Sequence, residues 1–366
     1  MEGRSIQTDA NTWLTDKAKP VIIAGPCSAE TEEQVLETAR RIKKLGKVDI
    51  FRAGIWKPRT RPNSFEGVGK VGLPWLQSVK KETGLQITVE VAKASHVELC
   101  LKAGIDILWI GARTTVNPFA VQDIADALKG VDVPILVKNP INPDLTLWLG
   151  AVERLQKVGL KKIGAIHRGF SNLGETYYRN TPQWQIALEF KRMMPLIPLI
   201  CDPSHICGRR DILFEVGQKA FDLNYDGLMI ESHIDPDNAW SDAKQQVTPQ
   251  VLGEMLSKFV LRKDFEDEAP VQNELQYLRE RIDHIDNELI NLLSDRMTIA
   301  REIGSFKKEH NMTILQLKRW NEIINRSMKK ANNVRLSEAF ILKLIRAIHD
   351  ESIEQQSIVF RDDKSQ

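Results

Sequence analysis

The chain has 366 residues, of which 42% are hydrophobic and 27% are charged. This length is long for one domain and comfortable for two, and the composition excludes a largely disordered protein. A formal net charge of +2 argues against nucleic acid or an anionic membrane as a partner, and no apolar run approaches the ~20 residues of a membrane span.

Residues 1–19 read as a short N-terminal extension. They contain no hydrophobic core of a secretory signal. The four cysteines, Cys27, Cys100, Cys201 and Cys207, are scattered along the chain and do not have the spacing of a disulfide framework. We therefore expect reduced thiols in a cytoplasmic protein.

From residue 20 to about 261, short apolar strands alternate with amphipathic segments. The strands are rich in Ile, Val and Leu, which is typical of a parallel sheet buried on both faces. Eight such units in about 240 residues favour a (β/α)8 barrel of the α/β class. An open doubly wound sheet is the alternative, but no GxGxxG sequence follows the first strand. The expected strands are 21–25, 49–54, 87–91, 106–112, 134–138, 162–168, 198–202 and 227–232.

A charged segment that ends in proline, residues 262–270, is the best candidate for a linker. No strand pattern remains beyond it. Residues 271–366 contain one long helical pattern, a polar break near 308–313 and two further helical patterns at about 314–331 and 335–357. The expected C-terminal domain is therefore an all-α unit of three helices.

Ionisable side chains follow the predicted strands, at the end of a (β/α)8 barrel where active sites lie. The segment FRAGIWKPRTRP (51–62) places four cations in a loop fixed by glycine and proline, although a solvated face is the ordinary interpretation of such a run. Cations also follow later strands, and together they suit two anionic substrates, at least one of them phosphorylated. The expected substrate-binding residues are Arg52, Lys57, Arg59, Thr60, Glu90, Arg113, Lys138, His167 and Arg168.

A second group at the strand ends mixes a thiol, an imidazole and two carboxylates: Cys27, His205, Glu231 and Asp242. Each residue alone is more often a buried hydrophobe or a satisfied polar side chain. The first, seventh and eighth strands are neighbours in a closed barrel, so the four residues should meet. Such a donor set fits a divalent transition metal better than Ca²⁺ or Mg²⁺.

Eight short motifs run through residues 20–260: GPCSAE (25–30), KPRTRPNSFEG (57–67), GART (111–114), VKNP (137–140), HRGF (167–170), DPSHICG (202–208), IESH (230–233) and SDAKQQ (241–246). Together they resemble the short type I beta kind of 3-deoxy-D-arabino-heptulosonate 7-phosphate (DAHP) synthase. The resemblance implies condensation of phosphoenolpyruvate with erythrose 4-phosphate, the first step of the shikimate pathway. Arg61 and Glu66 stand where the usual motif has Ser and Gln.

The same resemblance implies roles for individual residues. Cys27, His205, Glu231 and Asp242 would be the metal ligands, for Mn²⁺ or alternatively Fe, Co or Zn. Phosphoenolpyruvate would be held by Arg52, Lys57, Arg113, Lys138 and Arg168. Arg59 and Thr60 would hold the sugar phosphate, and the proton carrier stays open among Lys57, His205 and Glu231.

Apolar residues in the first tail helix step by three and four positions, from Leu275 to Phe306, in a coiled-coil-like period. Arg296 interrupts this seam, and Lys307 lies eleven residues further on nearly the same face. An Arg that reaches out to solvent or pairs with a nearby Glu is the ordinary interpretation. A cation inside an apolar seam otherwise needs an anion to meet it. In the last helix Ser352 and Gln356 form an i, i+4 pair.

This tail pattern resembles the all-helical chorismate mutases over about 273–358. The resemblance implies an intertwined homodimer, possibly within a larger assembly, that converts chorismate to prephenate without a metal. Lys307 and Gln356 would hydrogen-bond the ether oxygen. Arg279, which lies far from Arg296 along the helix, would serve the partner chain's site. The matching residues are Arg279, Arg296, Lys307, Arg319, Ser352 and Gln356, while Gln316 and Trp320 stand where relatives carry acids near the substrate hydroxyl.

The leading hypothesis is a bifunctional enzyme whose helical domain also mediates inhibition of the barrel by prephenate. One alternative is a synthase whose tail only senses ligands and dimerises. Another is a 3-deoxy-manno-octulosonate 8-phosphate synthase, which typically carries a KANRS-like loop in place of KPRT (57–60).

Overall fold

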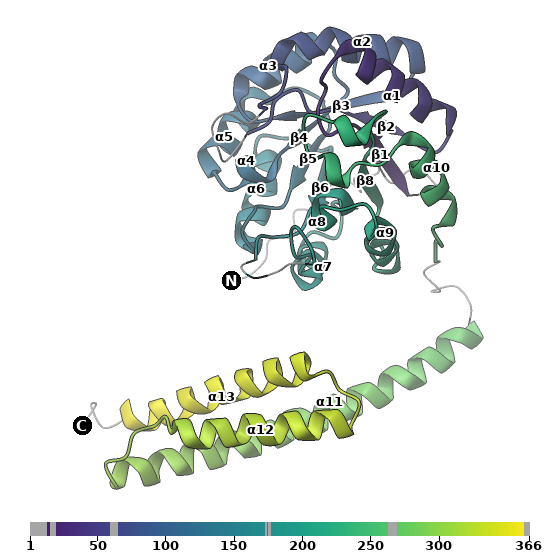
Figure 1. Cartoon of the computed structure of the whole chain (residues 1–366). Helices are drawn as coiled ribbons and strands as arrows, with labels where there is room; N and C mark the ends of the chain where they lie inside the picture. The colour runs from purple at the N-terminus through teal and green to yellow at the C-terminus, as the bar shows by residue number, and fades with distance from the viewer. Residues whose placement is uncertain are drawn as a thin grey trace. The chain divides into compact units, whose positions relative to one another are not determined.

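The computed structural model describes residues 13–14, 20–58, 65–172, 174, 177–262 and 269–361. The chain divides into two compact units, Met1–Arg262 and Lys263–Gln366 (Figure 1). Arg59 and Thr60, two of the predicted sugar-phosphate residues, lie outside the described residues. None of the described helices is both long and apolar enough to cross a membrane.

The first unit is a closed barrel of parallel strands that pair in chain order, with β1 joined to β8. This confirms the predicted (β/α)8 fold. Six of the eight strands are shorter than the predicted apolar runs, because the flanking residues leave the hydrogen-bonded ladder, whereas the first has the predicted bounds and the third begins one residue earlier. They are β1 (Val21–Gly25), β2 (Ile50–Arg52), β3 (Gln86–Val91), β4 (Ile107–Ile110), β5 (Ile135–Lys138), β6 (Ile163–His167), β7 (Leu199–Cys201) and β8 (Gly227–Glu231).

Side chains along each strand alternate between the barrel interior and the layer under the helices. One set of alternate residues, for example Ile50, Leu136 and Ile166, forms an apolar cluster inside the barrel. The residues next to them in the chain, for example Phe51 and Val137, belong to a second apolar cluster between the strands and the helices. Leu14, from the predicted N-terminal extension, joins the interior cluster. A residue two positions after an interior residue therefore points into the mouth of the barrel.

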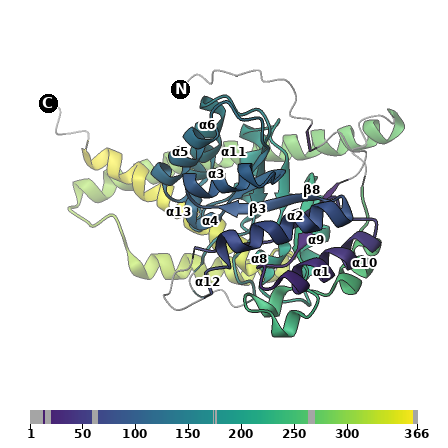
Figure 2. The same cartoon turned by 90° about the horizontal axis from the view of Figure 1, so that it is seen from above.

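The barrel helices are amphipathic and bury one face against the strands. Polar side chains cap several of them; for example, Thr31 accepts a hydrogen bond from the backbone N–H of Gln34 at 3.1 Å. Figures 1 and 2 show α1, α2 and α10 side by side on the outside of the barrel. The helices are α1 (Glu32–Lys44), α2 (Gly72–Thr83), α3 (Ala94–Lys102), α4 (Ala112–Thr115), α5 (Pro118–Ala127), α6 (Leu145–Lys157), α7 (Trp184–Met193), α8 (Pro203–Cys207), α9 (Leu213–Asp222) and α10 (Pro249–Lys258), with 3₁₀ turns at Gly69–Val71, Pro236–Asn238 and Ala243–Gln245.

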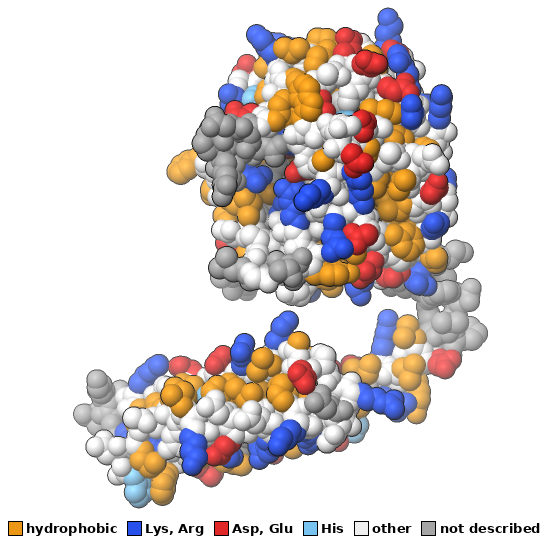
Figure 3. Space-filling view, in the orientation of Figure 1, with side chains coloured by type: hydrophobic (Ala, Val, Ile, Leu, Met, Phe, Trp, Pro, Cys, Tyr) orange, Lys and Arg blue, Asp and Glu red, His pale blue; other side chains and the backbone are white. Residues whose placement is uncertain are grey.

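The second unit consists of α11 (Ala269–Glu309), α12 (Leu317–Asn333) and α13 (Glu338–Arg361). Helix α11 has 41 residues and begins inside the segment 262–270 that the sequence suggested as a linker. Helix α13 packs against both α11 and α12. Apolar side chains are visible along this unit in Figure 3, and Leu278, Ile282 and Ile285 of α11 are exposed.

Candidate active sites

A cavity of about 180 Å³ opens at the carboxyl ends of the strands. It collects side chains from all around the barrel because strand ends converge there. Most of its walls are charged or polar. The lining residues are Arg52, Lys57, Pro58, Glu90, Gly111, Ala112, Arg113, Lys138, Ile141, Arg168, Arg179, Asn180, His205 and Asp242.

The cations of this cavity are held in place by buried partners. Arg52 is 2% exposed, its Nη2 lies 3.3 Å from Oε1 of Glu231, and its guanidinium stacks over Trp109 with Cζ 5.0 Å from the ring centroid. Its Nε and Nη1 are buried without a hydrogen-bond partner. Lys138 is also buried, and its Nζ donates to Oδ2 of Asp202 at 2.7 Å. Buried donors without acceptors at the mouth of a cavity are suited to an anionic ligand.

Arg168 is aimed by two amide side chains. Its Nη1 donates to Oδ1 of Asn180 at 2.6 Å, and its backbone N–H donates to Oδ1 of Asn139 at 2.6 Å. Burial lowers the pKa of Arg168 to about 10, and neighbouring Arg179 and Arg113 add to the shift while Asp202 opposes it. The guanidinium is still charged at neutral pH and concentrates positive potential in the cavity.

Three of the four predicted metal ligands meet beside these cations. One donor atom each of Cys27, Glu231 and Asp242 lies within 4.8 Å of the other two. The Sγ of Cys27 lies 3.1 Å from Oδ2 of Asp242, and Lys57 Nζ contacts the same sulfur. Strands β1 and β8 are paired, so residues more than 200 positions apart share this corner.

The fourth predicted ligand, His205, lines the same cavity. Its Nδ1 lies 3.7 Å from Oε1 of Glu231 and 2.9 Å from Oδ2 of Asp202, but it is not aligned for a hydrogen bond with either oxygen. Asp202 caps α8 by accepting from the backbone N–H of His205 at 3.0 Å. Asp202 therefore sets the position of the imidazole.

The donor chemistry and the unpaired atoms of this corner fit a divalent transition metal. Oε1 of Glu231 and Nδ1 of His205 are buried without hydrogen-bond partners. Burial raises the pKa of the Cys27 thiol to about 12, with Glu231 adding to the rise and Lys57 opposing it. Burial also acts to raise the pKa of Asp242, but Lys57 and Arg179 outweigh it and hold that pKa well below its usual range. A bound cation would stabilise the thiolate that burial disfavours.

Three residues of this site were missed at the sequence level: Arg179, Asn180 and Gln245. Nη1 of Arg179 donates to Oδ1 of Asp242 at 3.0 Å and to Oε1 of Gln245 at 2.6 Å. Nε2 of Gln245 donates to Oε2 of Glu231 at 2.6 Å. The SDAKQQ motif contains Gln245, so a search for amides beside predicted ligands would have found it, but nothing local marks Arg179.

His167 does not belong to this cavity, contrary to its prediction as a substrate-binding residue. Its Nε2 lies 2.6 Å from the carbonyl oxygen of Pro182 and its Nδ1 lies 2.9 Å from the hydroxyl of Tyr225. The ring packs among aromatic side chains that include Trp148 and Trp184. Strand alternation explains the error: Ile166 faces the interior, so His167 faces the helices.

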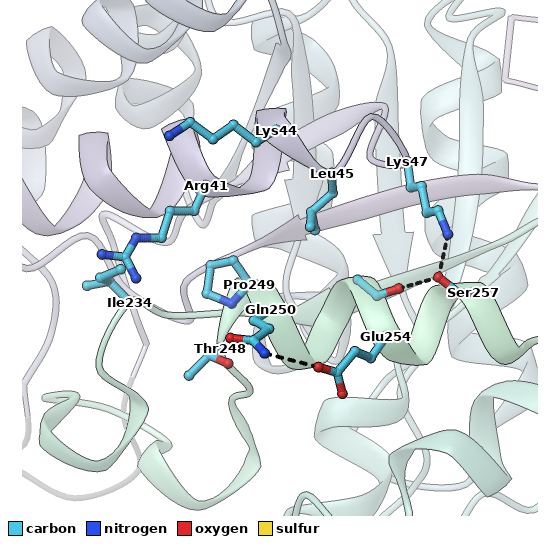
Figure 4. A pocket seen from close by; sticks show the side chains of 11 residues that line it. Arg41, Lys44, Leu45, Lys47, Ile234, Thr248, Pro249, Gln250, Glu254 and Ser257 are labelled. Atoms are coloured by element: carbon cyan, nitrogen blue, oxygen red, sulfur yellow. Dashed lines mark hydrogen bonds between the residues drawn. The ribbon is translucent and has the colours of Figure 1, made fainter.

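A larger cavity of about 630 Å³ lies on the outside of the barrel between α1 and α10 (Figure 4). Two of its cations already have partners on the surface: Arg41 bonds Glu37 at 2.7 Å, and Lys47 bonds Ser257 at 2.5 Å. It lacks the buried, unpaired polar atoms of the barrel mouth. We therefore assign the chemistry to the smaller cavity.

The helical unit has its own cavity of about 390 Å³. It brings together five of the six residues predicted for the tail: Arg296, Lys307, Arg319, Ser352 and Gln356. Nη1 of Arg296 contacts Oγ of Ser352, and Nζ of Lys307 donates to Oε1 of Gln356 at 3.0 Å. Burial lowers the pKa of both cations. Arg279, the sixth, is exposed and does not line this cavity.

Two family models match the chain. The DAHP synthetase I family matches residues 5–264, and chorismate mutase type II matches residues 278–357. The chain belongs to the DAHP synthetase I family. Its helical unit carries a chorismate mutase type II domain.

Relatives with two different names match this chain, and those from Thermotoga maritima agree with this assignment. The phospho-2-dehydro-3-deoxyheptonate aldolase of Thermotoga maritima is 32% identical over 237 residues, which cover 65% of this chain and 68% of that protein. A crystal structure of the DAHP synthase from Thermotoga maritima superimposes with a TM-score of 0.60 at 30% identity, over 66% of this chain and 68% of that one. The 2-dehydro-3-deoxyphosphooctonate aldolase of Desulfotalea psychrophila is 27% identical, over 69% of this chain and 94% of that protein.

Proposed function

We propose that the barrel condenses phosphoenolpyruvate, erythrose 4-phosphate and water to DAHP and phosphate with the help of a divalent metal. The observation that carries the proposal is the arrangement of buried cations directly beside the cluster of Cys27, Glu231 and Asp242. Family membership and the relative from Thermotoga maritima support the same reaction.

The side chains of the barrel would orient two anions that repel each other. Arg52, Lys138 and Arg168 would hold phosphoenolpyruvate in a water-poor cavity where charge–charge attraction is strong. Lys57 lines the same cavity and its Nζ contacts the Sγ of Cys27, so we propose that it faces the aldehyde end of the sugar phosphate. A bound Mn²⁺, or alternatively Fe, Co or Zn, supplies Lewis acidity toward the aldehyde oxygen.

Lys57 and His205 are our candidates for proton transfer, because both line the cavity. Burial lowers the pKa of His205, with Lys138 adding to the shift and Asp202 and Glu231 opposing it. The imidazole is therefore neutral at pH 7, as either a metal ligand or a general base requires. Arg113 and Glu90 complete the substrate-facing wall.

We propose further that the helical cavity rearranges chorismate to prephenate. Arg296 and Arg319 would clamp the two carboxylates of the substrate, with Ser352 holding Arg296 in place. Lys307 and Gln356 are hydrogen-bonded to each other beside the cavity, where they could donate to the ether oxygen as negative charge develops there. No metal and no covalent step are needed.

The exposed apolar residues of α11 are the basis for proposing a homodimer through the helical unit, possibly within a larger assembly. In such a dimer the exposed Arg279 would complete the partner chain's cavity. Four free, buried cysteines suit a reducing compartment, and we propose the cytoplasm. We also propose that prephenate bound to the helical unit inhibits the synthase.

The first test is phosphoenolpyruvate consumption with erythrose 4-phosphate by chelator-stripped protein, with and without Mn²⁺. Turnover only with the metal supports the proposed reaction, and absence of turnover with any of Mn²⁺, Fe²⁺, Co²⁺ or Zn²⁺ refutes it. The variant Arg168→Met should lose synthase turnover and retain chorismate turnover. Synthase rates that do not change across a prephenate titration would refute the feedback proposal.

The second candidate for the barrel is a 3-deoxy-manno-octulosonate 8-phosphate synthase, favoured by relatives such as that of Desulfotalea psychrophila. Arabinose 5-phosphate in place of erythrose 4-phosphate separates the two candidates. For the tail, the alternative is a module that binds ligands and dimerises without catalysis. The full chain would then bind prephenate but leave chorismate unchanged.

A further inference from the structure

The helical cavity contains a histidine that no part of the proposed mechanism uses. The ring of His349, on α13, stacks on Trp320 of α12 with centroids 3.9 Å apart and planes 10° from parallel. Both side chains line the cavity. The Nε2 atom of His349 is buried and has no hydrogen-bond partner. A buried ring nitrogen without a partner is costly, which suggests that a bound ligand supplies the partner.

The other polar groups of the cavity are mostly donors. Arg296, Lys307 and Arg319 are cations without acceptor atoms, and among the described residues no acidic side chain lines the cavity. The side-chain oxygen of Gln356 already accepts from Lys307, and Ser352 Oγ contacts Arg296. His349 Nε2 is therefore one of the few acceptor positions open to a ligand, together with the amide of Gln316.

The charges around His349 keep its ring neutral. Burial lowers the pKa of His349, and Arg296 and Lys307 of α11 lower it further, whereas only the adjacent Asp350 on α13 raises it. Arg319 on α12 adds a further cation to the same cavity. A neutral imidazole with its proton on Nδ1 presents a lone pair at Nε2. The flat stack on Trp320 fixes the direction of that lone pair.

We propose that His349 determines ligand specificity in the helical cavity, by accepting at Nε2 a hydrogen bond from the ring hydroxyl of the bound dianion. This inference rests on the proposed mutase function. The cations recognise the carboxylates, which any similar dianion offers. The histidine would distinguish a hydroxylated ring from one without the hydroxyl, because an acceptor left unpaired in a closed cavity penalises the wrong ligand.

The test measures prephenate binding to the full chain by calorimetry. The variant His349→Phe keeps a flat ring against Trp320 and removes the acceptor, so we expect Kd for prephenate to rise about 3- to 10-fold. The matched control is His310→Phe, because His310 also stacks on an aromatic ring, that of Phe306 at 4.1 Å, but does not line the cavity. Its Kd should equal that of the wild type.

A prephenate analogue with hydrogen in place of the ring hydroxyl completes the cycle. It should bind His349→Phe at least as tightly as it binds the wild type, because the variant has no acceptor to leave unpaired, and weaker binding by the variant would overturn the hydroxyl assignment. The ¹⁵N resonance of His349 Nε2 in the wild type should also move when prephenate binds, a readout that no folding defect can imitate. An unchanged resonance, or an unchanged prephenate Kd in His349→Phe, overturns the inference.

The wild type distinguishes this failure from failure of the proposed function. If the wild type neither binds prephenate nor rearranges chorismate, the mutase function itself is refuted, and the role of His349 with it. If the wild type does both, only the comparisons above decide about His349. Chorismate turnover by His349→Phe should show a higher KM with a smaller change in kcat, as expected for lost binding rather than lost chemistry.

Discussion

Substitution of Gln245 tests the proposed metal site without removing any of its proposed ligands. Gln245 is 1% exposed and joins two proposed ligands, because its Nε2 donates to Glu231 at 2.6 Å and its Oε1 accepts from Arg179, which also bonds Asp242. Replacing Gln245 by Leu keeps most of the volume and removes both hydrogen bonds. The proposed ligand Glu231 would then lose its partner at Oε2.

The expected effect follows from these contacts. A hydrogen bond to a charged group contributes ~1.5–3 kcal/mol, and loss of a residue that orients a metal ligand typically weakens metal binding about 10- to 100-fold. We therefore expect the Mn²⁺ affinity of Gln245→Leu to fall about 10- to 100-fold. Activity at saturating Mn²⁺ should fall much less, because the ligands themselves remain.

The Mn²⁺ affinity is measured by titrating chelator-stripped protein with Mn²⁺. Calorimetry and the electron paramagnetic resonance signal of free Mn²⁺ both follow the binding. The matched control is Gln250→Leu, because Gln250 is exposed and also donates to a carboxylate, that of Glu254 at 3.1 Å. Equal Mn²⁺ affinity in wild type, Gln245→Leu and Gln250→Leu would refute the view that this amide orients a metal ligand.

Three further predictions concern other parts of the chain. Arg296→Met should lower chorismate turnover at least ~100-fold and leave the synthase rate unchanged, and equal loss of both activities would contradict separate sites. Burial lowers the pKa of His167 to about 4, whereas the unfolded chain has a histidine pKa of about 6.5. Between these two pH values His167 is protonated only in the unfolded chain, so acidification from pH 7 to 4 should lower the free energy of unfolding by about 3 kcal/mol. The variant His167→Gln should not show this loss. Urea unfolding at pH 7, 5.5 and 4 measures this difference. Gly25→Ala should yield little folded protein, because at φ +149° a Cβ atom would collide with the backbone carbonyl of Arg52. In the control Gly46→Ala, at φ +62°, the added Cβ meets no atom, so the free energy of unfolding should fall by only about 1 kcal/mol, measured by thermal or urea unfolding.

The sequence by itself determined the barrel and most of the residues at its mouth. Apolar runs that alternate with amphipathic segments indicate a parallel sheet covered by helices, and eight such units favoured a closed barrel over an open sheet. Arg52, Lys138 and Glu231 each follow an apolar interior residue by two positions, for example Ile50 before Arg52. Because strand side chains alternate with a period of two, these three residues face the cavity. The same rule places His167, next to the interior residue Ile166, on the side of the helices and therefore outside the cavity.

Only the tertiary structure decided which distant side chains touch. Arg179 reaches Asp242 across 63 positions of chain, and nothing near either residue indicates the contact. The stack of Trp320 on His349 likewise requires α12 and α13 to pack at one particular register. Strand and helix periodicity is local, so a sequence reveals which face a residue occupies. Contacts between loops and between helix faces depend on how all the elements of a unit pack together. Local sequence patterns do not specify that packing.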